Sequence, residues 1–163
     1  MKINKKGQLL ERPFIVIFIV IVSAFIFIFG FYLINNLIKQ SNCAQLGLSI
    51  NDLKQDVDRY YSFDAGSSTD INFKLPSGIK YVCFKNFDED LDKSELDKID
   101  STLYSFFNNL NYNIIFTPYG YCTKSFFKID KIKVNSNPLC ALNTGNIKLH
   151  LENKGDYVEI SKI

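Results

Sequence analysis

Histidine is almost absent from this chain, because His150 is the only one among 163 residues. The sequence also lacks a recognisable nucleophile motif and a glycine-rich phosphate loop. Catalytic triads and zinc enzymes draw on histidines placed beside other reactive groups. We therefore expect no catalytic residue, no cofactor and no metal site. His150 itself is expected to be an exposed residue on the polar face of a strand.

Positive charge is scarce beyond the first residues. After residue 34 the chain carries fifteen Lys and Arg against sixteen Asp and Glu. A nucleic-acid-binding domain normally shows a basic face, because phosphate contacts supply most of its affinity. Nucleic acid is therefore excluded as a partner, and no small-molecule substrate is evident.

Charge is missing altogether between Phe14 and Ile34, a run of twenty-one residues. At about 1.5 Å per residue, a helix of this length spans roughly 30 Å, the thickness of the hydrocarbon core of a bilayer. A cleaved secretory signal would have a shorter apolar region of about 7 to 15 residues, ending in small residues. The run therefore predicts a transmembrane helix.

The flanks of this helix indicate its direction. Lys2, Lys5, Lys6 and Arg12 precede it, whereas only Lys39 stands in the first ten residues after it. Positive flanks stay in the cytoplasm. We expect a single-pass protein of the cell membrane, with the lipid bilayer as its first partner. The expected parts are a basic cytoplasmic tail at 1–13, a transmembrane helix at 14–34, a juxtamembrane linker at 35–43 and an extracytoplasmic domain at 44–163.

The residues before the helix, KKGQLLE at 5–11, resemble the class III signal peptide of archaeal pilin-like proteins. The resemblance implies that a membrane peptidase cuts after Gly7, so that the mature chain begins at Gln8. In that family a Glu, usually at the fifth mature position, neutralises a neighbouring subunit's amine in the filament. Here Glu11 is the fourth mature residue. Gly7, Gln8 and Glu11 are thus the candidate processing site.

The outer part of the chain is similar to membrane-anchored archaeal proteins of unknown function. The similarity lies in Leu75-Pro76-Ser77-Gly78, Val82-Cys83-Phe84 and Asn137-Pro138-Leu139-Cys140. It implies no known activity.

Four cysteines, Cys43, Cys83, Cys122 and Cys140, all follow the apolar run. An even number in an oxidising compartment predicts two disulfides. The alternative is a zinc site, but structural zinc ligands come in pairs two to four residues apart, and the gaps here are 40, 39 and 18 positions. Three pairings are open. Strand-like surroundings favour Cys83 with Cys140, which leaves Cys43 with Cys122.

Two helices are expected after the apolar run. Leu46, Ile50, Leu53, Val57 and Tyr60 form one helical face between residues 44 and 61, with a bend favoured near Gly47. A second helix starts at Asp92, with Glu95 as its capping partner. Its apolar stripe consists of Leu96, Ile99, Leu103, Phe106 and Leu110.

Alternation of apolar and polar residues predicts the strands. The run at 79–84 is apolar on both faces, so it should be a central strand, paired through the turn at 76–78 with the strand before it. Further strands are expected at 113–117, 126–134 and 147–152, the last followed by a hairpin turn at 153–156. The order of elements predicts an α+β domain with two helices packed on a mostly antiparallel, disulfide-bonded sheet.

Two surface features leave the function open. The acidic loop at 88–92 begins like a calcium loop, but Lys93 and Ile99 stand where an EF-hand needs Gly and Glu, so we expect a solvated loop before a helix. Adjacent aromatic pairs mark either an interaction surface or a second small core. They are Tyr60 and Tyr61, Phe106 and Phe107, Tyr119 and Tyr121, and Phe126 and Phe127.

These features favour a membrane-anchored structural or assembly protein of the cell envelope, pilin-like at its N-terminus, that associates with itself or with other envelope proteins. The alternative is a membrane-tethered binding module that recognises a protein or envelope ligand. An enzyme is not expected.

Overall fold

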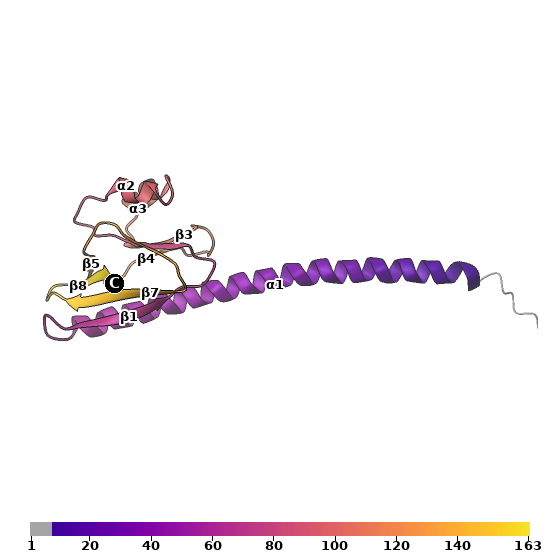
Figure 1. Cartoon of the computed structure of the whole chain (residues 1–163), viewed down its shortest axis with the longest axis horizontal. Helices are drawn as coiled ribbons and strands as arrows, with labels where there is room; N and C mark the ends of the chain where they lie inside the picture. The colour runs from indigo at the N-terminus through magenta and orange to yellow at the C-terminus, as the bar shows by residue number, and fades with distance from the viewer. Residues whose placement is uncertain (1–7) are drawn as a thin grey trace, which may run out of the picture. The chain divides into compact units, whose positions relative to one another are not determined.

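The computed structural model describes residues 8–163, and its side chains from Pro13 onward. The chain divides into two compact units, with the boundary between Ile38 and Lys39. Figure 1 shows the elements of both units. Gly7 lies outside the described residues, as do the side chains of Gln8 and Glu11, so the candidate processing site stays a prediction.

Helix α1 runs without a break from Gln8 to Tyr61 and contains Pro13. The helix is not interrupted at Gly47, where a bend was expected, and residues 35–43, expected as a linker, are helical. A glycine inside a helix costs about 1 kcal/mol relative to alanine. Burial of the neighbouring Leu46 and Ile50 offsets this cost, since each fully buried aliphatic side chain contributes about 1.5 to 3 kcal/mol.

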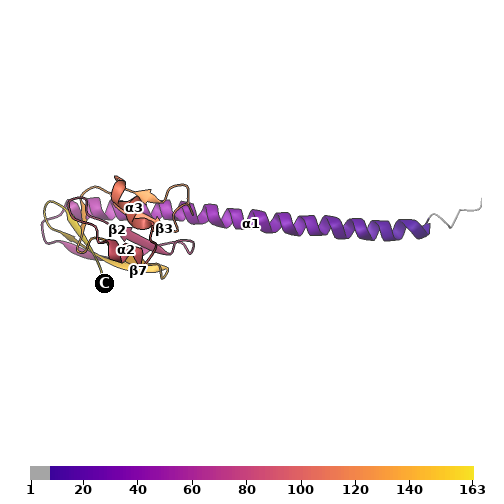
Figure 2. The ribbon, with the colours of Figure 1, turned by 90° about the horizontal axis from the view of Figure 1, so that it is seen from above.

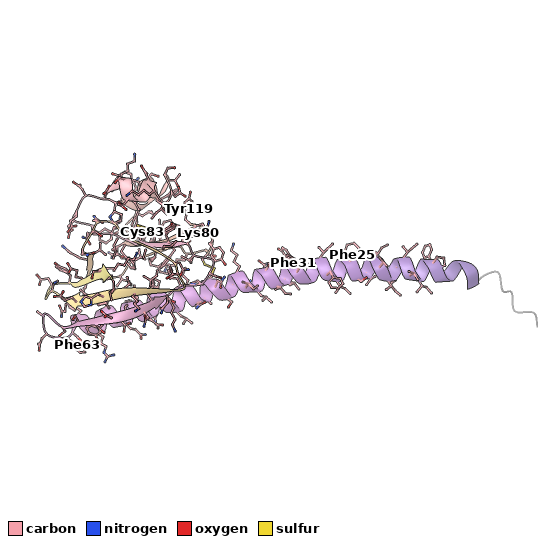
Figure 3. The ribbon with its side chains drawn as sticks, in the orientation of Figure 1. Phe25, Phe31, Phe63, Lys80, Cys83 and Tyr119 are labelled. Carbon is pink, nitrogen blue, oxygen red and sulfur yellow. A yellow bond between two sulfur atoms is a disulfide. The ribbon has the colours of Figure 1, made fainter. Side chains whose placement is uncertain are left out.

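The first unit holds the apolar part of α1. Its most apolar 18-residue window has a mean hydropathy of 3.2, and none of that window is buried. Phe25 and Phe31 project from this part of the helix (Figure 3), each more than two-thirds exposed. By length and composition, this helix is able to cross a membrane.

The second unit contains two four-stranded sheets. Sheet A has the order β1 (Ser68–Lys74), β7 (Asn146–Asn153), β8 (Val158–Lys162) and β5 (Ile132–Val134), and only the β5–β8 pair is parallel. Sheet B has the order β4 (Phe126–Phe127), β3 (Ile114–Thr117), β2 (Tyr81–Phe84) and β6 (Leu139–Leu142), with every pair antiparallel.

The expected class, a mixed α+β domain with antiparallel sheets and two disulfides, is confirmed, as is the central position of β2. Its expected pairing with β1 is wrong. The turn at Pro76, closed by a 3.0 Å hydrogen bond from the Ile79 nitrogen, carries the chain from one sheet to the other. The expected strand at 126–134 is likewise divided, because the Asn113 side chain binds the backbone of Ile129 between β4 and β5.

The main core lies between sheet A, one face of sheet B and the second half of α1. Leu46, Leu53 and Val57 of α1 are buried in it, as the helical face at 44–61 predicted. The rings of Phe73 and Phe116, from the two sheets, lie 6.5 Å apart. The hairpin between β7 and β8 also forms as expected.

A smaller core covers the other face of sheet B. Helices α2 (Lys93–Asp97) and α3 (Leu103–Asn109) lie over β2 and β3 (Figure 2) and bury Leu96, Leu103 and Phe107. The single helix expected here is wrong in extent, since a turn separates α2 from α3. Asp100 causes this break, because its carboxylate accepts hydrogen bonds from the nitrogen and hydroxyl of Thr102.

Candidate functional site

The four cysteines form two disulfides, Cys43–Cys122 and Cys83–Cys140, which is the pairing favoured by the sequence. Cys83 and Cys140 face each other across the β2–β6 pair. Cys43 lies in α1, and Cys122 lies in the segment Pro118–Lys124, which follows β3 and is called the stapled loop below. One bond therefore ties neighbouring strands, and the other ties a loop to the helix.

Tyr121 adds a second attachment of the stapled loop to α1. Its hydroxyl accepts a 2.8 Å hydrogen bond from the side-chain amide of Asn42, and the ammonium of Lys39 lies 5.7 Å from its ring centre. The ring also lies directly on Gly78, where an added Cβ would come within 2.0 Å of it. The glycine is thus required by close contact with an aromatic ring.

The outer side of the stapled loop is aromatic. Tyr119 is 38% exposed and Phe106 43% exposed, and their ring centres lie 5.1 Å apart. The Tyr119 hydroxyl is 2.9 Å from the Thr102 hydroxyl. Phe107, next to Phe106, is completely buried. The second small core expected for the aromatic pairs thus forms around Phe107, whereas an interaction surface at exposed Phe106 and Tyr119 stays a prediction.

A hollow of about 690 Å³ adjoins this surface and is lined by Tyr81, Ile99 and half-exposed Leu142, together with Leu75, Ser77, Ile79, Lys80, Asn143 and Gly145. It lies at the start of β2 and the end of β6. A smaller hollow beside it shares Lys80, Tyr81 and Ile99 and includes Thr117. The Thr117 hydroxyl is buried and has no hydrogen-bond partner among the described residues. Figure 3 labels Lys80, which lines both hollows, and Tyr119 of the stapled loop.

A third hollow, of about 440 Å³, lies between α1 and β1. Asp52 and Asp56 line it together with Asn72. Burial raises the pKa of Asp56, Asp52 raises it further, and Arg59 opposes the change. The Ser49 hydroxyl closes one end by donating a 2.6 Å hydrogen bond to the Lys74 carbonyl. The hollow therefore combines two acidic side chains with apolar ones, among them Leu48, Ile71 and Phe73.

The acidic loop at 88–92 acts as a helix start. Asp92 caps α2 by accepting hydrogen bonds from the nitrogen and hydroxyl of Ser94. Glu95, the expected capping partner, instead pairs with Lys98. Within residues 8–163 no group of three or more His, Cys, Asp or Glu is arranged to hold a metal ion.

Lys85 is a buried cation that the sequence analysis missed. It is only 5% exposed, and its ammonium donates hydrogen bonds to the carbonyl oxygens of Phe107 and Leu110. It thereby caps the end of α3, where carbonyls lack partners within the helix. Burial lowers the pKa of Lys85. The available sign in the sequence was a lysine directly after the apolar strand β2.

His150 lies on the polar face of β7, as expected. Its Nδ1 is 2.6 Å from the Asp70 carboxylate on the neighbouring strand β1. Both side chains are partly exposed, so this pair is a surface contact between strands. Ser161 of β8 lies opposite His150 on its other side, but among the described residues no hydrogen bond joins the Ser161 hydroxyl to this imidazole.

Comparison with known proteins found no matching family model, no similar curated protein and no similar solved structure.

Proposed function

We propose that this protein is anchored in the cell membrane by α1, with its disulfide-bonded unit outside, and that it serves as a structural or assembly component of the cell envelope. The observation that carries the proposal is the exposed, charge-free stretch of α1 from Phe14 to Ile34. The eighteen large exposed apolar side chains of this stretch are very costly in water, and burying them in lipid removes that cost.

The disulfides support an outer location for the second unit. Disulfides persist in oxidising spaces and are rare in the cytosol. All four cysteines are paired, so the described residues contain no free thiol. The basic residues before the helix favour a cytoplasmic N-terminus.

The pilin-like part of the proposal draws on α1 itself. Pilins continue as a helix from the processed N-terminus, and the described residues from 8 onward are helical through Pro13. The N-terminal residues support cleavage after Gly7 and association of the apolar helices in an assembly.

Thiol labelling on intact cells tests the topology. A membrane-impermeant maleimide should label the protein only after treatment with a membrane-impermeant reductant. Asn4→Cys combined with Gly7→Leu, which should keep the first seven residues on the chain, provides the matched control, because its added thiol should react only after the cells are permeabilised. Labelling of this double variant at Asn4→Cys on intact cells would overturn the orientation.

N-terminal sequencing of protein isolated from native membranes tests processing. A chain that starts at Gln8 supports the pilin-like proposal, and a Gly7→Leu variant should then keep its first seven residues. A chain that starts at Met1 removes the pilin-like part and leaves the anchoring proposal intact.

A membrane-tethered binding module is the second candidate, favoured by the hollow beside Tyr81, Ile99 and Leu142. Pockets lined by apolar side chains with a few polar groups are typical ligand sites. Leu142→Arg should abolish capture of an envelope partner in cross-linking on intact cells. Lys162→Glu, at the exposed end of β8, is the control. Equal capture by both variants would remove this candidate.

A further inference from the structure

The stapled loop is connected to the apolar segment by very little chain. Asn35 and Asn36 follow Ile34, and Leu37 and Ile38 are the last apolar residues before the first charge, on Lys39. Cys43, which holds the loop, comes five residues after Ile38. Five residues span about 7.5 Å as a helix and at most about 18 Å when fully extended. The disulfide therefore keeps Cys122 near the last apolar residues, whatever the orientation of the two units.

The exposed side chains of the loop suit the boundary between lipid and water. Tyr119 presents an apolar ring with a polar tip and contacts the exposed ring of Phe106. Aromatic residues of this kind are enriched where a membrane meets water, because the ring lies among the headgroups while the hydroxyl stays hydrated. The headgroup layer on each side of a bilayer is about 5 to 8 Å thick. The five residues after Ile38, ending at Cys43, span a similar distance, about 7.5 Å, as a helix.

The charges near this surface are mostly positive. Lys39 lies against Tyr121, exposed Lys124 lies 5.1 Å from the ring centre of Phe127, and exposed Lys80 lines the adjoining hollow. Asp100 is the acidic residue that lines the same hollow. A cationic and aromatic surface of this kind favours anionic lipid headgroups.

We infer that the stapled loop rests in the headgroup layer of the membrane, with Tyr119 among the headgroups and Lys39 and Lys124 against lipid phosphates. The partner is the anionic lipid surface around the chain's own anchor. This inference rests on the proposed anchoring by α1. It adds a second contact with the membrane, which would fix the orientation of the outer unit.

The absence of tryptophan from the chain allows a direct test with the full-length protein in bilayer nanodiscs that contain anionic lipid. Three variants each carry one tryptophan, namely Tyr119→Trp, Phe63→Trp and Phe31→Trp. Phe63 is the matched control, since it is 45% exposed and follows the other end of α1. Nitroxide-labelled headgroups and brominated acyl chains serve as the quenchers.

We expect headgroup nitroxide to quench Tyr119→Trp at least threefold more than Phe63→Trp, and brominated chains to quench Phe31→Trp. Equal headgroup quenching of the first two variants would overturn the inference, while quenching of Phe31→Trp would leave the anchoring proposal standing. Failure to quench Phe31→Trp would contradict the anchoring itself. A blue shift of Tyr119→Trp that grows with protein-to-lipid ratio, without headgroup quenching, would identify a second copy as the partner and overturn the inference.

A charge series tests the role of the lysines. In the Tyr119→Trp chain, Lys39→Gln with Lys124→Gln should reduce headgroup quenching about twofold. The matched control, Lys148→Gln with Lys162→Gln, changes two exposed lysines of sheet A and should leave quenching unchanged. An equal effect of both pairs would overturn the assignment of Lys39 and Lys124 to lipid phosphates.

Discussion

Gly78 and Tyr121 form a contact between residues 43 positions apart. The tyrosine ring occupies the space where a side chain at position 78 would lie, and its hydroxyl reaches Asn42 of α1. The sequence predicted a turn at Gly78 from its composition, but it contained no sign that a distant aromatic ring would lie on that turn.

Gly78→Ala should therefore destabilise the outer unit. Overpacking a tight contact costs about 1 to 3 kcal/mol, so thermal unfolding followed by near-UV circular dichroism should move down by several degrees. A second change, Tyr121→Ala, should make Gly78→Ala nearly neutral. Gly47→Ala is the control of opposite sign, because an added Cβ there meets nothing and alanine favours the helix. Lack of coupling between positions 78 and 121 would contradict the contact.

Lys85, directly after the apolar strand β2, shows that a buried charge can have a structural role. Its ammonium satisfies the carbonyl oxygens of Phe107 and Leu110 at the end of α3. Lys85→Met keeps the approximate length of the side chain but leaves the Phe107 oxygen, which is buried, and the Leu110 oxygen, which is partly buried, without this donor. The loss of a donor to a buried oxygen costs about 1 to 3 kcal/mol. We expect a lower unfolding midpoint and faster amide exchange in α3, whereas Lys80→Met, at an exposed position, should change neither. Unchanged exchange in α3 would contradict the capping role.

At the scale of elements, periodic patterns predicted what local sequence determines. The face at Leu46, Ile50, Leu53 and Val57 and the hairpin between β7 and β8 formed as expected. The pairing of β1 did not, because its partner β7 begins 72 positions after Lys74 and no turn between them specifies the register. In the region 92–110, apolar spacing continued across a break created by the side chain of Asp100.

Asp92, which caps α2, and Asp100, which holds the turn before α3, make the layer of α2 and α3 sensitive to acid. Hydrogen bonds from Ser94 lower the pKa of Asp92, and hydrogen bonds from Thr102 lower that of Asp100. A lowered carboxyl pKa gives stability that is present above the unfolded-state value, near 4, and is lost as the pH falls through the folded-state value. The thermal unfolding midpoint should therefore fall as the pH is lowered below about 4.

Asp92→Asn combined with Asp100→Asn should flatten this acid dependence, because the amide oxygen still accepts the capping hydrogen bonds but does not titrate. Thermal unfolding midpoints of the unchanged chain and of each variant, measured between pH 6 and pH 2, provide the comparison. Asp64→Asn is the control, since the Asp64 carboxylate accepts no hydrogen bond from the described residues, and it should keep the dependence of the unchanged chain. Parallel curves for all three proteins would contradict the capping explanation.

At the scale of the molecule, the two disulfides close overlapping stretches of chain, with sequence separations of 79 and 57 residues. In the chain-entropy model each bond contributes about 4 kcal/mol, a large part of a typical stability of about 5 to 15 kcal/mol. The bonds differ in what they hold. Strands β2 and β6 remain paired by backbone hydrogen bonds without Cys83–Cys140, whereas the stapled loop depends mainly on Cys43–Cys122 and Tyr121.

Removing the Cys43–Cys122 bond should therefore loosen one loop first. In Cys43→Ser with Cys122→Ser, we expect limited proteolysis to cut at Lys124 before other sites. The loop at 64–67 should resist, because Asn153 binds its backbone and the carbonyls at the end of α1. Cys83→Ser with Cys140→Ser, the matched control, should lower the unfolding midpoint without this early cut. Both variants should stay in the membrane fraction, since burial of the apolar helix does not depend on sulfur. Early cutting at Lys124 in both variants would show that the disulfides stabilise the unit as a whole and do not hold the loop locally.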